Sequence, residues 1–235
     1  YMIYSPKRGS RLAYATSKSP TGPFTYRGYI VDNGVDYPGG NNHGSVACIN
    51  GQWYIFYHRM TNGTIASRRG CVEKITLLPD GTIPPVEMTS LGFEDSLNPY
   101  EVSPADIACV LKGGALVTEK NVFDRVVTNI QDGSVIGYKY YDFGDDFGSK
   151  TMEFSARILG MGCDAVMHIL IDGEDGEEIG CCRIGHDSAV IHTIVKSVTG
   201  RHAVFFKITT EYVGWMGDMF RGRNLFELCS FVFLK

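Results

Sequence analysis

The sequence has 235 residues, of which 44% are hydrophobic and 20% are charged, with a formal net charge of −4. These values are typical of a soluble globular protein with one large or two smaller domains. Because the chain is mildly acidic, has no basic run and has no apolar run as long as a membrane-spanning helix, we expect neither nucleic acid nor a membrane as a partner.

The first part of the chain, up to about residue 92, alternates short strand-like segments with turns and has almost no helical periodicity. Its clearest hairpin joins segments 45–50 and 52–58 through Asn50-Gly51, a dipeptide that favours the positive φ angles of a tight turn. Short strands of this kind suit β-propeller blades or a β-sandwich. Because the chain opens inside a strand-like segment, we expect a fragment of a longer protein. The predicted strands are 1–5, 11–16, 25–31, 45–50, 52–58 and 71–78.

A short polar stretch, Asn41-Asn42-His43-Gly44-Ser45, directly precedes this hairpin. Small and polar residues around a single imidazole predict a loop that presents His43 at the mouth of a β-scaffold. The alternative is an ordinary turn in which the Asn and Ser side chains bond their own backbone.

The second part of the chain also has the pattern of an all-β domain. Prolines interrupt the pattern between residues 79 and 104, and we expect a linker over residues 93–104. Seven or more antiparallel strands at the spacing that follows predict a jelly-roll or similar sandwich over residues 105–235. The predicted strands are 134–143, 151–159, 165–172, 177–184, 190–198, 202–210 and 225–234.

The seven cysteines occur at irregular spacing, which is typical neither of a disulfide framework nor of a zinc site. We expect most of them to be small buried hydrophobic residues.

Several motifs of the first part resemble glycoside hydrolase family 43. Residues 15–28 resemble its A-x-S-x-S-P-x-G-P-F segment, and the 41–45 loop, the 51–59 strand, Ser67-Arg68 and the segment 71–73 follow in the family's order. The resemblance covers about residues 1–92 and implies the last blades of a five-bladed β-propeller.

This resemblance implies an inverting glycosidase of the arabinofuranosidase or xylosidase type, acting on arabinoxylan, xylan or arabinan side chains. Inversion needs two carboxyl groups about 6.5–9.5 Å apart. In the family the base, the tuning acid and the proton donor come from earlier blades, so they would precede residue 1. We therefore expect the chain alone to be inactive and to need missing N-terminal blades or a complementing chain. A polysaccharide-degrading parent would be extracellular or periplasmic, with the cytoplasm as an alternative.

The acids within the first part offer no obvious replacement. None falls in a catalytic motif, and we expect all of them to be exposed turn residues. They are Asp32, Asp36, Glu73 and Asp80.

The resemblance also implies supporting site residues. His43 matches the family histidine that binds a calcium or sodium ion at the propeller centre, often through water, because calcium prefers oxygen ligands. Arg68 matches an arginine that faces the sugar, where its guanidinium can donate a fork of hydrogen bonds. Asn42, next to His43, is assigned to the substrate site. The alternatives are a turn histidine and a solvated arginine, and we expect His58 to be a packed side chain.

The second part resembles a family 6 carbohydrate-binding module in segments 129–138, 169–180, 198–203 and 224–228. Such modules hold a sugar between two aromatic planes at a loop end, with a polar residue fixing the hydroxyls. The resemblance implies that Trp215 is one plane and Asn224 the polar residue. Val135 occupies the other aromatic position, so Tyr138 is the candidate for the second plane.

Two alternatives to the glycosidase part remain. The chain could be a non-catalytic carbohydrate-binding protein that uses Trp215 and Asn224, or a scaffold module whose second part only supports the first.

Overall fold

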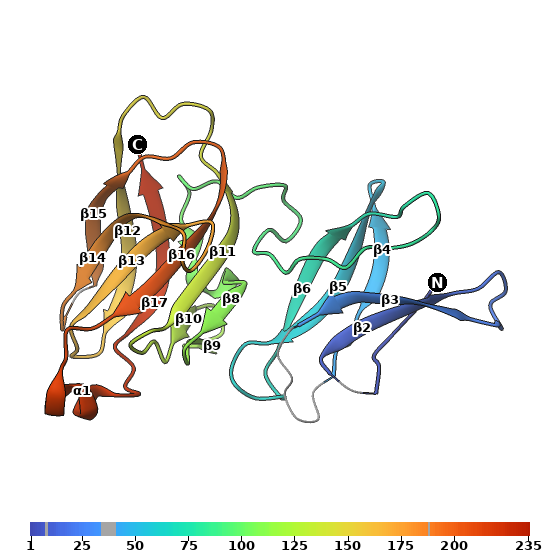
Figure 1. Cartoon of the computed structure of the whole chain (residues 1–235), viewed down its shortest axis with the longest axis horizontal. Coiled ribbons are helices and arrows are strands. Elements are labelled where there is room, and N and C mark those ends of the chain that lie inside the picture. The colour runs from blue at the N-terminus through green and yellow to red at the C-terminus, as the bar shows by residue number, and fades with distance from the viewer. Residues whose placement is uncertain (8, 34–40, 188) are drawn as a thin grey trace. The chain divides into compact units, whose positions relative to one another are not determined.

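Figure 1 shows a computed structural model, which describes residues 1–7, 9–33, 41–187 and 189–235. The turn-rich run 36–40 and the candidate acid Asp36 lie outside these residues. The chain folds as two units, Tyr1–Met88 and Thr89–Lys235. Both are built almost entirely of antiparallel strands, which confirms the predicted all-β class. No helix in the described ranges is long and apolar enough to cross a membrane.

Unit 1 contains two three-stranded antiparallel sheets, and all six predicted strands are present. Asn50 and Gly51 have φ angles of 51° and 85°, as predicted for the turn between the fourth and fifth strands. Side chains from both sheets form one core that includes Leu12, Tyr14 and Ile55. The strands are β1 (Met2–Tyr4), β2 (Arg11–Thr16), β3 (Thr25–Asp32), β4 (Ser45–Ile49), β5 (Gln52–Met60) and β6 (Arg68–Ile75).

Gly44 lies where the loop before β4 runs against this core. A Cβ atom at this position would lie 2.3 Å from the carbonyl oxygen of Phe56 and 2.4 Å from Cδ1 of Leu12. Any larger residue would therefore push the loop away from the sheet, so the glycine sets the position of His43.

Unit 2 is a sandwich of two antiparallel sheets, with strand orders β15-β12-β17-β10-β9 and β14-β13-β16-β11-β8 (Figure 1). Its core lies between the sheets and is rich in contacting aromatic rings, including those of Phe154, Phe206 and Phe231. The elements are β7 (Ser103–Pro104), η1 (Ala105–Ile107), β8 (Val110–Lys112), β9 (Leu116–Glu119), β10 (Arg125–Thr128), β11 (Val135–Asp142), β12 (Thr151–Gly160), β13 (Ala165–Ile171), β14 (Glu177–Ile184), β15 (Val190–Lys196), β16 (Arg201–Thr209), α1 (Gly214–Phe220) and β17 (Phe226–Leu234).

The segment expected as a linker, residues 93–104, lies within unit 2. Leu97 forms a bridge with Tyr141, and β7 pairs with β17. The division between the units falls after Met88 rather than after residue 92. Strands β8, β9 and β10 and helix α1 were not predicted, because each is short and shows no clear apolar period.

The seven cysteines are all free thiols. Cys109, Cys163, Cys182 and Cys229 are buried, as expected for small hydrophobic residues, whereas Cys48 and Cys181 are exposed.

Candidate functional site

The ends of four strands bring polar side chains together at one end of unit 1. Asn33 follows β3, Asn42 and His43 precede β4, and His58 lies near the end of β5. Arg68 opens β6 and pairs with Met60, while His58 pairs with Gly70. Because alternate residues of a strand share a face, Arg68 and His58 lie on the same side of this sheet.

Asn42 holds the backbone of His58, and His43 holds its imidazole. The Asn42 side chain is fully buried, and its Oδ1 accepts the backbone N–H of His58 at 3.1 Å. The backbone N–H of His43 donates to Nδ1 of His58 at 3.2 Å. The neutral His58 ring therefore carries its proton on Nε2. The rings of His43 and His58 lie roughly parallel, with centroids 5.7 Å apart.

His58 is a buried, uncharged imidazole. Only 8% of the residue is exposed, as expected for a packed histidine. Burial lowers the pKa of His58 below its ordinary value, and the positive charge of Arg68 lowers it further. His58 is thus neutral at pH 7 and is a hydrogen-bond donor through Nε2.

The same end of unit 1 holds all the buried side-chain nitrogen and oxygen atoms that have no hydrogen-bond partner within the described ranges. An unpaired buried polar atom costs about 1–3 kcal/mol, so such atoms normally meet water, a ligand or further protein. The atoms are Asn33 Oδ1, Asn41 Oδ1, Asn42 Nδ2, His58 Nε2 and Thr61 Oγ1. Among the described residues, this end of unit 1 is therefore where buried polar side chains lack partners.

The three site residues of unit 1 differ in accessibility. The side chains of His43 and Arg68 are exposed, and Arg68 Nε donates to the carbonyl oxygen of Ile65 at 3.2 Å. Asn42 is enclosed, so its observed contacts give it a positioning role toward His58 rather than direct access to a ligand.

A metal ion at His43 would need ligands beyond these residues. The described residues contain no group of three or more His, Cys, Asp or Glu side chains that could hold a metal. Calcium takes about 6–8 oxygen ligands. The nearest unpaired oxygen in the sequence is Oδ1 of Asn41. An ion at His43 would therefore need further oxygen ligands, from amide or backbone carbonyl groups, water or other protein.

The described candidate acids of unit 1 are bound to local partners. Asp32 pairs with Arg11 at 2.8 Å, and Asp80 accepts hydrogen bonds in its own turn. The expectation that Glu73 is an exposed turn acid was wrong, because Glu73 lies in β6, is 5% exposed and accepts the Tyr57 hydroxyl at 3.2 Å. Glu73 pairs with Ile55 of β5, so the Glu73 side chain shares a face with the core residues Ile55 and Tyr57.

Unit 2 has a cavity of about 460 Å³ at the loop end where α1 lies. Its lining includes Asp132, Asp218 and Arg221, together with Tyr212 and Phe220. The rings of Tyr212 and Phe220 stack on each other, with centroids 4.1 Å apart and an interplanar angle of 10°. The sequence does not predict this pair, because two aromatic residues eight positions apart in a loop form no pattern that indicates a contact.

The predicted sugar-binding residues of unit 2 have different positions from those expected. Trp215 lies on α1 and is 72% exposed, so its ring is accessible. Tyr138 is fully buried in the sandwich core, and its hydroxyl donates to the carbonyl oxygen of Ala105 at 3.0 Å. The prediction that Tyr138 supplies a stacking plane was therefore wrong.

Asn224 is used to hold the loops of unit 2 together. Its Oδ1 accepts the backbone N–H of Ile130 at 2.9 Å, and its Nδ2 donates to Thr128 Oγ1 at 3.1 Å. Both ends of the amide are thus occupied within the protein. The structure gives Asn224 a structural role, and its contact with a sugar stays a prediction.

The chain is similar to several known glycosidases. No family model matches the chain. A "Xylosidase/arabinosidase" of Thermoclostridium stercorarium is 44% identical over 191 residues, which cover 67% of this chain and 40% of that protein. An "Arabinoxylan arabinofuranohydrolase" of Bacillus subtilis (strain 168) is 30% identical over 229 residues, 88% of this chain and 44% of that protein.

Among solved structures, a glycoside hydrolase family 43 arabinoxylan arabinofuranohydrolase from Bacillus subtilis, in complex with cellotetraose, is 28% identical with a TM-score of 0.57. The match covers 96% of this chain and 48% of that one. A family 6 carbohydrate-binding module from Clostridium cellulolyticum, in complex with xylose, matches 59% of this chain at 22% identity and a TM-score of 0.49. The chain spans less than half the length of each of the three glycosidase relatives.

Proposed function

Because the chain is related to the xylosidases and arabinofuranohydrolases of glycoside hydrolase family 43, we propose that it is the non-catalytic portion of a larger glycosidase. Unit 1 corresponds to a part of the β-propeller, and unit 2 to the β-sandwich. The proposed reaction of the whole protein is inverting hydrolysis of O-glycosyl bonds in arabinoxylan, xylan or arabinan side chains.

One observation supports this proposal more than any other. A single family 43 arabinoxylan arabinofuranohydrolase matches 96% of the chain, so both units find their counterparts in one glycosidase. A free-standing binding module would account for unit 2 alone.

In the proposed protein, the polar end of unit 1 forms part of the wall of a sugar pocket. Arg68 is exposed, and the terminal nitrogens of its guanidinium can donate to sugar hydroxyls. His58 offers a neutral N–H donor, the backbone N–H of His43 orients its ring through Nδ1, and Asn42 holds its backbone. The carboxyl groups that activate water and protonate the leaving oxygen would be supplied by protein outside this sequence.

His43 would hold the proposed calcium or sodium ion of this pocket. Its exposed imidazole is one ligand, and waters or groups from outside this sequence would complete the shell. The ion would add positive charge near the carboxyl groups and favour their ionised forms. If this is so, calcium should raise the melting temperature of a complete pocket, and His43→Ala should remove that increase.

Unit 2 is proposed to bind polysaccharide through Trp215. An exposed indole on a helix with no buried residues does not contribute to the core, and its face is suited to stack on the apolar side of a sugar ring. This role does not require Tyr138 or Asn224.

Retention on insoluble arabinoxylan tests this proposal. We expect the 235-residue chain to be retained, Trp215→Ala to be released, and neither protein to hydrolyse aryl arabinofuranosides or aryl xylosides. Phe123→Ala is the matched control, because Phe123 is 91% exposed on a hairpin tip outside the cavity lining. Equal retention of wild type and Trp215→Ala would contradict the role of Trp215, and hydrolysis by the chain would contradict its non-catalytic assignment.

A further inference from the structure

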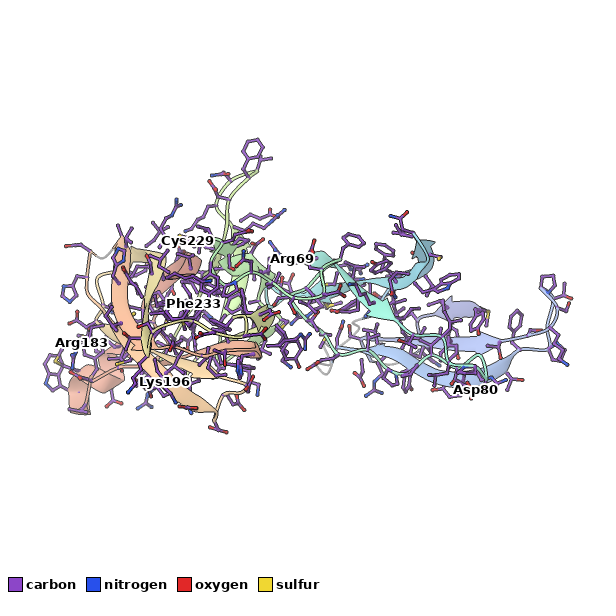
Figure 2. The ribbon with its side chains drawn as sticks, turned by 90° about the horizontal axis from the view of Figure 1, so that it is seen from above. Arg69, Asp80, Arg183, Lys196, Cys229 and Phe233 are labelled. Carbon is purple, nitrogen blue, oxygen red and sulfur yellow. The ribbon has the colours of Figure 1, made fainter. Side chains whose placement is uncertain are left out.

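A second cavity lies at the other end of unit 1, where β2 ends and β3 begins. Its volume is about 590 Å³, within the range of small-molecule sites. Figure 2 labels Arg69, the neighbour of Arg68, toward one end of unit 1. It labels Asp80, which lines this cavity, toward the other end. The cavity is therefore separate from the polar cluster around His58. The side chains that matter for its chemistry are Tyr1, Thr16, Lys18, Pro23, Arg27 and Asp80.

The cavity has an excess of positive charge that is available to a ligand. Arg27 Nε donates to Thr16 Oγ1 at 2.9 Å, which orients the guanidinium and leaves its two terminal nitrogens without a hydrogen bond among the described residues. Lys18 is exposed and has no ion pair within those residues. Two cations therefore line the cavity beside one carboxylate, Asp80.

Asp80 is already occupied by its own turn. Its Oδ1 accepts the backbone N–H of Thr82 at 2.9 Å and the Thr82 hydroxyl at 2.7 Å. These hydrogen bonds lower the pKa of Asp80 below its ordinary value, and the nearby charge of Arg27 contributes less. Asp80 thus stays ionised, and its single negative charge offsets only one of the two positive charges.

The cavity also has an apolar wall. The ring of Tyr1 is held by its hydroxyl, which donates to the carbonyl oxygen of Gly81 at 2.6 Å, and by parallel packing on Tyr14 with centroids 6.4 Å apart. Within this chain, 59% of Tyr1 is exposed. Pro23 adds a second apolar surface. A fixed aromatic ring next to free cations suits a ligand with both an apolar ring face and an anionic group.

We propose that this cavity binds a uronic acid residue of an acidic polysaccharide, with its carboxylate on Arg27 and Lys18 and its ring C–H face against Tyr1. An arginine fork matches the planar geometry of a carboxylate, and such charge-assisted bonds are stronger than neutral ones. The proposal rests on the proposed function only in taking polysaccharide as the source of the uronic acid. It adds recognition of acidic side groups at a place in unit 1 that is separate from Arg68.

Titration of the full 235-residue chain with three probes tests this proposal, using calorimetry and amide NMR shifts. The probes are a xylo-oligosaccharide that carries glucuronic acid, the neutral xylo-oligosaccharide of equal length, and inorganic phosphate. We expect the acidic saccharide to bind most tightly and to shift the amides of residues 16–27 and Gly81. Binding should weaken as ionic strength rises.

Substitutions separate charge recognition from a structural effect. Arg27→Gln and Lys18→Gln should each weaken binding of the acidic saccharide about tenfold or more. Asp80→Asn should strengthen it, because the amide can still accept from Thr82 but no longer repels the ligand. Arg183→Gln, a change at an arginine of unit 2 with 78% side-chain exposure, should have no effect.

The proposal is overturned if the neutral saccharide or phosphate binds as tightly as the acidic saccharide, or if Arg27→Gln leaves the affinity unchanged. If the chain is retained on neutral arabinoxylan through Trp215 but the acidic saccharide shifts no amide signals, this inference fails and the proposed function stands. Amide shifts caused by the acidic saccharide, without retention on neutral arabinoxylan, would contradict the proposed role of Trp215 and leave this inference standing.

Discussion

Gly44→Ala is the substitution for which the structure gives the sharpest expectation. The new Cβ would lie 2.3 Å from the Phe56 carbonyl oxygen and 2.4 Å from Cδ1 of Leu12. Leu12 is 1% exposed, so it has no free space into which to move. Overpacking of this kind costs about 1–3 kcal/mol, and the backbone contact places the cost at the upper end of that range. The loop that carries His43 would also shift.

Urea unfolding followed separately for the two units measures this effect. We expect Gly44→Ala to lower the midpoint of unit 1 and to leave that of unit 2 unchanged. Gly70→Ala is the matched control, because Gly70 lies in β6 and a Cβ there meets no atom within 4 Å. If Gly44→Ala were as stable as Gly70→Ala, the close contact that positions the His43 loop would be refuted.

Three further predictions concern single side chains. Asn42→Ala should destabilise unit 1 by about 1–3 kcal/mol, because the buried N–H of His58 loses its acceptor, and urea unfolding would show it. The lowered pKa of His58 predicts that unit 1 loses stability as pH falls from about 6.5 toward that lowered value, because the unfolded chain then binds a proton that the folded chain does not. His58→Gln should therefore flatten this part of the plot of melting temperature against pH. An unchanged slope would count against the burial of a neutral ring. Tyr138→Phe should leave binding to arabinoxylan unchanged and lower the stability of unit 2 by only about 0.5–1.5 kcal/mol, because the Ala105 carbonyl loses the Tyr138 hydroxyl but keeps the backbone N–H of Ala108. Weaker retention by the folded variant would restore Tyr138 as a binding residue.

The regular strands could be predicted because their periodicity is local. Met152, Phe154, Ala156 and Ile158 alternate with polar residues and all face the core of unit 2. The turn at Asn50-Gly51 follows from the same kind of short-range signal.

The candidate site was harder to predict because it depends on contacts between distant segments. Tyr138 lies in a strand whose pairing shifts between Tyr138 and Tyr141, so the alternation there does not show which ring is buried. The amide of Asn224 contacts Thr128 and Ile130, which are more than 90 residues away. Burial of Glu73 depends on the cross-strand core residues Ile55 and Tyr57. None of these pairings is visible in the spacing of the residues themselves.

The resemblance to glycoside hydrolase family 43 identified two site residues that residue spacing alone did not indicate. His43 and Arg68 were identified from motif order, and the structure brings both to the end of unit 1 that holds the unpaired buried atoms. Their roles toward a sugar stay predictions, since they concern groups outside this sequence.

The most direct test of the central claim is hydrolysis of an aryl arabinofuranoside by a chimaera. In it, the upstream part of the Bacillus subtilis arabinofuranohydrolase is joined to this chain, which replaces the matching region of that enzyme. We predict that the chimaera hydrolyses the substrate, that Arg68→Ala lowers its kcat/KM about tenfold or more, and that the 235-residue chain alone shows no turnover. A folded chimaera without activity, or turnover by the chain alone, would contradict the claim that this chain completes a sugar pocket whose carboxyl groups come from other protein.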